Sequence, residues 1–140
     1  MTPTDFFDML GAPLKNVQWS WGARRERDGT VFLRVWQDEI ETSNSSQYVR
    51  LTNFQKAKKY REQNNRDRLG FRERLEHVEL VKNGAKCQLV MCIAVDKEAI
   101  PRKIKDFIKD RLFPAGKIVQ RNDDWWAELL PSVPVNQVKL

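Results

Sequence analysis

The sequence predicts an α+β domain in which a mixed, curled sheet is flanked by two or three helices. Three observations lead to this prediction. Pairs of strand-like segments surround turn signals at Asp28-Gly29 and at 122–124. The run from Lys86 to Val95 is apolar after its first residue, as expected of a central strand. Apolar residues at helical spacing follow Gly70.

The first expected element is a short helix. Thr2 can cap its N-terminus, Pro3 suits the first helical position, and Gly11 suits the end. An apolar stripe would pack this helix on the body of the domain, and it consists of Phe6, Met9 and Leu10.

The segment from Val17 to Glu41 reads as a β-hairpin and holds three of the five tryptophans. Strand alternation in its first arm places four residues on one face, namely Val17, Trp19, Trp21 and Ala23. In the second arm, one face holds Val31, Leu33 and Val35, and the opposite face holds Phe32, Arg34 and Trp36. Because this arm is apolar on both faces, we expect a central strand.

The remaining elements are predicted from alternation, helical spacing and turn residues. We expect a polar loop at 42–46, a strand at 47–52, a helix at 70–83, a strand at 86–95, a helix from Pro101 to 112, and a hairpin with arms 117–120 and 125–129. Residues 53–68 form a basic segment with a short helix and a mobile connection. We expect one domain over 1–130 and an extended tail or linker over 131–140.

The net charge of +6 is concentrated in one part of the chain. Between Lys56 and Arg74, eight basic residues face three acidic ones, a net charge of +5. Such a segment indicates either a polyanion partner or a solvated linker. The candidate phosphate-binding residues are Arg24, Arg25, Lys56, Lys58, Lys59, Arg61, Arg66, Arg68, Arg72 and Arg74.

Several classes of function are disfavoured. No apolar run is long enough to span a membrane, the N-terminus is unlike a secretory signal, and two cysteines at odd spacing in one strand favour a reduced, cytoplasmic setting. His77 is the single histidine, and no glycine-rich phosphate loop is present. We therefore expect no cofactor, no metal site and no membrane association, and a binding domain rather than an enzyme.

A metal-dependent nuclease remains an alternative because of the basic charge. No acidic residue has a lysine two positions later, which is the spacing of the restriction-enzyme type. Asp38, Glu39 and Glu41 could still hold a magnesium ion, or could form a charged strand exit.

The tryptophans provide the leading hypothesis. On one strand face, Trp19 and Trp21 could form the walls of a slot with Trp36 as its floor, which would hold a base by stacking or a methylated ammonium. Ser20, Gln37 and Asp38 would then line the slot. The small side chain of Ser20 would let backbone groups approach the ligand, and Gln37 and Asp38 offer hydrogen bonds to its edge. The alternative is that all three rings belong to the core.

The W-S-W and V-W-Q-D-E segments beside a basic segment, with the order of hairpins and helices, resemble the PUA-like group of nucleic-acid readers, which includes EVE, ASCH and YTH domains. The resemblance implies a small curled barrel with an aromatic pocket for a flipped, often methylated, base. It assigns Trp19 and Trp21 as pocket walls and Ser20 and Asp38 as edge readers. We therefore expect a nucleic-acid reader, with DNA favoured over RNA and an effector fused or associated. A nuclease and a protein-interaction module are the alternatives.

Overall fold

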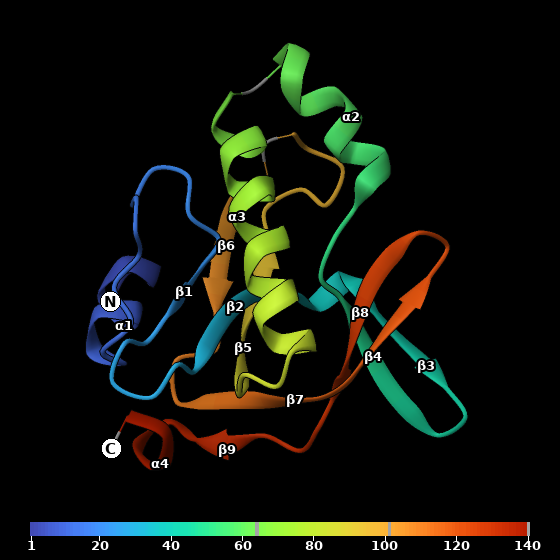
Figure 1. Cartoon of the computed structure of the whole chain (residues 1–140). Coiled ribbons are helices and arrows are strands. Elements are labelled where there is room, and N and C mark those ends of the chain that lie inside the picture. Colours follow the sequence, from blue (N-terminus) through green and yellow to red (C-terminus); the bar gives the residue numbers. More distant parts are fainter. Residues whose placement is uncertain (64, 101, 140) are drawn as a thin grey trace.

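The computed structural model describes residues 1–63, 65–100 and 102–139, with the backbone alone at 61–63 and 65. Within this part of the chain it is an α+β protein with nine strands in one mixed sheet and four α-helices (Figure 1). The α+β class and the mixed sheet agree with the sequence prediction.

The helices are α1 (Pro3–Met9), α2 (Phe54–Gln63), α3 (Asn65–Lys82) and α4 (Val135–Lys139), with a 3-10 turn η1 at Gln37–Glu39. The strands are β1 (Gly22–Arg24), β2 (Val31–Trp36), β3 (Ile40–Ser43), β4 (Ser46–Arg50), β5 (Cys87–Ala94), β6 (Ile104–Phe107), β7 (Arg111–Arg121), β8 (Asp124–Leu129) and β9 (Val133–Pro134).

The sheet is open. Its strands run in the order β1-β2-β5-β7-β8-β4-β3, with β6 on β5 and β9 on β7. Strands β2 and β5 are parallel, and the other pairs are antiparallel. The curled sheet or small barrel that we expected is not formed, because β1 and β3 lie at opposite ends of this order and do not pair in the described residues.

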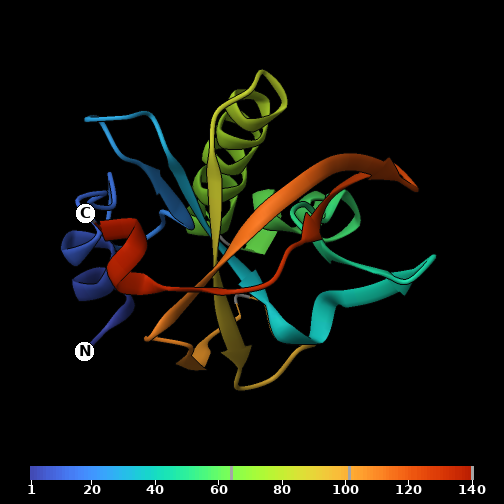
Figure 2. The ribbon, with the colours of Figure 1, turned by 90° about the horizontal axis from the view of Figure 1, so that it is seen from below.

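Two apolar clusters cover the two faces of strands β2 and β5. Phe32 and Val90 pack with α1 and α4 on one face, whereas Leu33 and Leu89 pack with Val78 of α3 on the other. Figure 2 shows α1 and α4 together on one side of the sheet and α3 on the other. The alternation that we expected along 31–36 therefore holds, and it separates the two cores.

Several expected elements are confirmed. Thr2 caps α1 in a capping box with Asp5. The hairpin around Asp28-Gly29, the central strand β5 and the hairpin at 111–129 are present. The helix expected from Gly70 begins earlier, at Asn65, and follows α2 closely.

Several expectations were wrong. The first hairpin arm is only β1, since residues 17–19 form a turn in which Ser20 N–H donates to the Asn16 carbonyl at 2.8 Å. The helix expected at 101–112 is replaced by β6 and the start of β7. Strand β6 pairs with the last residues of β5, beyond the part of β5 that pairs with β7. Pro101 itself lies outside the described residues.

The expected extended tail also differs from the structure. Residues 133–139 form β9 and α4, and Val135 and Val138 pack on the core that contains α1. The expected loop at 42–46 contains part of a hairpin, in which β3 and β4 are joined at Asn44-Ser45 with positive φ at both residues. No helix of the described part is both long and apolar enough to cross a membrane.

Candidate functional site

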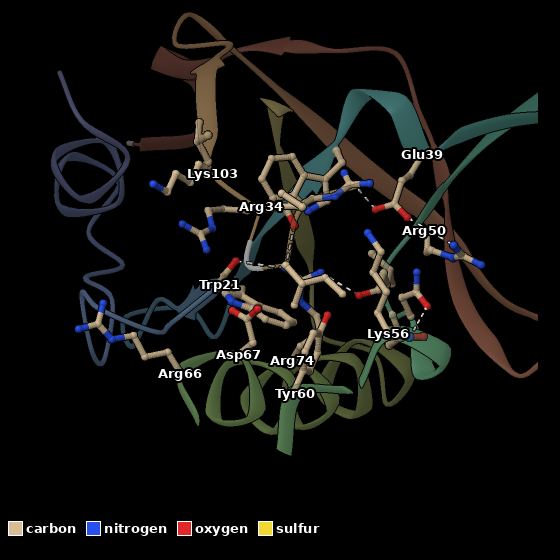
Figure 3. A pocket seen from close by; sticks show the side chains of 18 of the residues that line it. Trp21, Arg34, Glu39, Arg50, Lys56, Tyr60, Arg66, Asp67, Arg74 and Lys103 are labelled. Carbon is tan, nitrogen blue, oxygen red and sulfur yellow. Dashed lines mark hydrogen bonds and ion pairs between the residues drawn. The ribbon is translucent and has the colours of Figure 1, made fainter. Parts of the chain in front are cut away.

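A cavity of about 430 Å³ opens between β2, the helices α2 and α3, and the loop that follows β5 (Figure 3). Its size is within the range of ligand pockets. Among the described residues, three aromatic, seven basic and two acidic side chains line it: Trp21, Trp36 and Tyr60; Arg34, Arg50, Lys56, Arg66, Arg74, Arg102 and Lys103; Glu39 and Asp67.

Strand pairing places Trp21, Arg34 and Trp36 on one face. Gly22 pairs with Leu33, and the next hydrogen bond runs from Arg34 N–H to the Trp21 carbonyl at 3.0 Å. Residues opposite each other in an antiparallel pair share a face, as do residues two apart in a strand. Arg34 therefore lies between the two tryptophans, with Trp21 across from it and Trp36 two positions along β2.

Helix α3 fixes the position of the Trp21 ring. A Cβ atom on Gly70 would come within 2.5 Å of Trp21 Cε2 and 2.6 Å of the Trp19 carbonyl oxygen, so only glycine allows this close packing. Tyr60 and Phe71 meet the Trp21 ring edge-on, with centroids 6.0 and 6.5 Å away. The indole is thereby held on one wall of the cavity.

Arg74 ties together the backbone around the cavity. Its Nη1 donates to the Leu51 carbonyl at 2.9 Å, and its Nη2 donates to the carbonyls of Trp21 at 3.1 Å and Arg34 at 2.7 Å. The side chain is buried, and this burial lowers its pKa to about 10. Arg74 therefore connects α3 to the chain on both sides of β2.

One arginine of the loop after β5 covers the Trp36 ring. The guanidinium carbon of Arg102 lies 5.0 Å from the Trp36 ring centre. Its two terminal nitrogens donate to the Asp38 carboxylate at 3.0 and 2.9 Å, and Nη1 lies 3.7 Å from Glu39. Glu39 also meets Arg50 at 3.4 Å. These carboxylates, which we considered as magnesium ligands, are paired with arginines.

Arg34 differs from the other arginines of this wall. Its Nε is buried without a hydrogen-bond partner, and its guanidinium makes no hydrogen bond within the described part of the chain. Burial lowers its pKa, whereas the charges of Asp67 and Glu73 oppose this shift. Arg50 and Arg74 also have an unpartnered Nε, but their terminal nitrogens donate to carboxylates or carbonyls.

The predicted base-pocket residues are divided by the structure. Trp21 and Trp36 line the cavity, whereas Trp19, Ser20, Gln37 and Asp38 do not. The Ser20 hydroxyl is buried and donates to Glu73 Oε2 at 3.2 Å. Trp19 is separated from the cavity because β1 begins only at Gly22, so the expected alternation does not reach it.

The predicted phosphate-binding residues also fall into groups. Lys56, Arg66 and Arg74 line the cavity. Four others are exposed: Lys58 and Lys59 on α2, Arg72 on α3, and Arg24 on β1. Arg68 is half-buried on α3, and the Arg61 side chain lies outside the described residues.

Arg25 is unsuited to the phosphate-binding role that we expected. It is buried and donates to Asp28 at 3.1 and 2.8 Å and to the carbonyls of Leu10 at 3.1 Å and Val138 at 2.8 Å. Its guanidinium therefore joins α1, α4 and the β1–β2 turn.

Sequence reasoning did not identify Arg34, Tyr60, Asp67, Arg102 or Lys103 as site residues. Only Arg34 could have been identified from the sequence, because it is the single charged residue in the apolar run 31–36 and shares a strand face with Trp36. The others come from distant segments that only the fold brings to β2. In Figure 3 Tyr60 and Asp67 lie on the helical side of the cavity, and Lys103 lies across from them.

No group of three or more metal-ligating side chains occurs in the described residues. Both cysteines are buried in β5 and unpaired, and burial raises the pKa of Cys87 to about 12. No protein-family model, curated protein or solved structure matches this chain. Its function is therefore inferred from the cavity itself.

Proposed function

We propose that this chain is a nucleic-acid-binding module that accepts one unstacked base in the cavity. The observation that carries the proposal is the composition of the cavity wall, where three aromatic rings stand among seven basic and two acidic side chains of the described chain. Aromatic rings offer stacking surfaces that are worth about 1–3 kcal/mol per base. The excess of cations suits the phosphates that accompany a base.

The charge of the cavity decides between two ligands that an aromatic slot can hold. A methylated ammonium needs aromatic faces without nearby cations. Here Arg102 already occupies a position over the Trp36 ring, and Arg74 lies 5.9 Å from the Trp21 ring centre. A cationic ligand would be repelled, whereas a nucleotide combines an aromatic ring with negative charge.

Exposed cations on the two helices that border the cavity supply the phosphate contacts in this proposal. Lys58 and Lys59 lie on the surface of α2, and Arg72 lies on the surface of α3. Contacts of this kind carry no sequence information, and they make the affinity fall as the salt concentration rises. In this proposal, the helical surface holds the backbone while the cavity receives the base.

We extend the proposal to a PUA-like relationship, with DNA favoured over RNA and with a methylated base as one candidate ligand. An aromatic cavity beside a basic segment and a mixed sheet supports this relationship. The open order of the strands is a difference from a closed PUA-like barrel.

Binding of a labelled single-stranded oligonucleotide, measured by fluorescence anisotropy at two salt concentrations, tests the proposal. Trp21→Ala and Trp36→Ala should each weaken binding about tenfold, because a stacking surface is lost. Trp125→Ala is the matched control, since Trp125 lies outside the cavity. Lys58→Ala should weaken binding and reduce its dependence on salt. Equal losses for all three tryptophan variants would contradict the proposal.

A further inference from the structure

The position of Arg34 gives it a role that the stacking proposal does not explain. It lies on β2 between Trp21, its neighbour across the strand pair, and Trp36, two residues further along the same face. All three side chains line the cavity. A ring stacked on Trp21 would therefore lie beside the Arg34 side chain.

The Arg34 side chain is half-buried, and it lacks the hydrogen-bond partners that the buried Arg25 and Arg74 have. Its Nε is buried and unpartnered, and no described residue accepts a hydrogen bond from its terminal nitrogens. Buried donors in proteins are nearly always paired, so an unpaired one needs an explanation. An acceptor that arrives with the ligand is the explanation that the position of Arg34 in the cavity wall favours.

The shape of a guanidinium restricts which base can provide the acceptor. Its Nε–H and one terminal N–H point in parallel and match two neighbouring acceptor atoms. Guanine has such a pair in O6 and N7, and cytosine has one in O2 and N3. Adenine and thymine or uracil place an N–H donor beside the acceptor on these edges, so they would satisfy only one of the two donors.

We infer that Arg34 is the specificity-determining residue of the cavity and selects a base with two adjacent acceptors, namely guanine or cytosine. This inference rests on the proposed function. Asp67, which also lines the cavity, is compatible with it because an amino group of guanine or cytosine can donate to a carboxylate.

A phosphate group also presents two acceptors, and the test separates it from a base. The probes are single-stranded thymidine oligonucleotides in which one central base is replaced by guanine, cytosine or adenine. All four probes carry the same backbone charge, so differences between them report the base. Binding is measured with the wild-type protein, with Arg34→Lys, which keeps the charge but loses the fork, and with Arg34→Met.

The wild type should bind the guanine or the cytosine probe about tenfold more tightly than the adenine and all-thymidine probes. Arg34→Lys and Arg34→Met should lose this preference, because the guanine or cytosine probe should lose more affinity than the adenine and all-thymidine probes. Near-ultraviolet circular dichroism and thermal unfolding verify that both variants are folded. Lys58→Ala is the control that should weaken all four probes by the same factor.

Three results would overturn the inference and leave the proposed function intact. The first is equal binding of the four probes by the wild type, and the second is a uniform loss for all four in Arg34→Lys, which would assign Arg34 to phosphate. The third is retention of the preference in both Arg34 variants. Failure of the wild type to bind any probe at low salt would overturn the proposed function together with this inference.

Discussion

The two ends of the β1–β2 hairpin each hold an arginine, and the surroundings of the two side chains differ: Arg25 is buried and Arg34 is half-buried. At the turn end, Arg25 has two carbonyl partners and a bidentate carboxylate partner. At the open end, Arg34 has no hydrogen-bond partner for its guanidinium in the described chain. The difference indicates that Arg25 holds the fold, whereas Arg34 has the free donors that our inference assigns to a ligand.

The largest expected effect is at Arg74, which has a structural role like that of Arg25 but lies in the cavity. Arg74→Met would remove the donors to the carbonyls of Leu51, Trp21 and Arg34. We expect a loss of about 3–5 kcal/mol in the free energy of unfolding, measured by urea denaturation. Arg72→Met is the matched control on the same helix, where exposure predicts a change within about 0.5 kcal/mol. Similar losses in both variants would contradict the anchoring role.

The comparison of Arg25 with Arg34 is tested directly by the same substitution at both positions. Arg25→Met should lower the free energy of unfolding by about 2–4 kcal/mol, because Asp28 loses its partner and two carbonyls lose a donor. Arg34→Met should change it by less than about 1 kcal/mol, since no hydrogen bond is lost. Chemical denaturation measures both. A loss at Arg34 as large as that at Arg25 would show that Arg34 has a structural role.

His77 on α3 should make stability depend on pH. Burial, assisted by the charges of Arg74 and Lys15, lowers its pKa from 6.5 to about 4. The unfolded chain therefore binds a proton that the folded chain does not between these values, and the folded state loses stability as pH falls from about 6.5 to 4. The loss should reach up to about 3 kcal/mol.

The matching control is His77→Gln, which removes this titration. Burial raises the pKa of the neighbouring Glu73, and that change has the opposite sign, since it favours the folded state at lower pH. The difference between the unfolding free energies of wild type and variant therefore isolates His77. A difference that does not vary between pH 6.5 and 4 would contradict the assignment.

A smaller effect than at Arg74, Arg25 or His77 is expected at Gly70, where a substitution moves Trp21 without touching an arginine. Gly70→Ala places a methyl group against the Trp21 ring and the Trp19 carbonyl. Overpacking should lower the free energy of unfolding by about 1–2 kcal/mol, after the gain in helix propensity is subtracted. Near-ultraviolet circular dichroism should change, and oligonucleotide affinity should fall. An unchanged spectrum and affinity would show that the Trp21 position is not critical.

Local patterns were sufficient to predict elements that are determined locally. The capping residues of α1, the apolar β5 and the spacing that follows Gly70 each predicted an element that the structure contains. Residues 104–108 have apolar spacing that fits a helix, yet β6 forms there because the last residues of β5 pair with it. Long-range pairing of this kind has no signal in a single segment.

The candidate site was predictable only in part for the same reason. Trp21 and Trp36 flank a strand pair that the turn signal already indicated. Trp19 was assigned to the same wall because alternation was extended beyond the true start of β1 at Gly22. Tyr60 and Arg102 reach the cavity from segments far away in the chain, so no spacing within the sequence relates them to Trp36.

The central claim, that a base enters the cavity, is tested most directly by tryptophan fluorescence during titration with single-stranded oligonucleotides at low salt. We expect saturable quenching in the wild type and in Trp125→Phe, and loss of most of the quenching in the double variant Trp21→Phe/Trp36→Phe. Binding without quenching, or equal quenching in the double variant, would contradict the claim, because the nucleic acid would then bind away from the cavity.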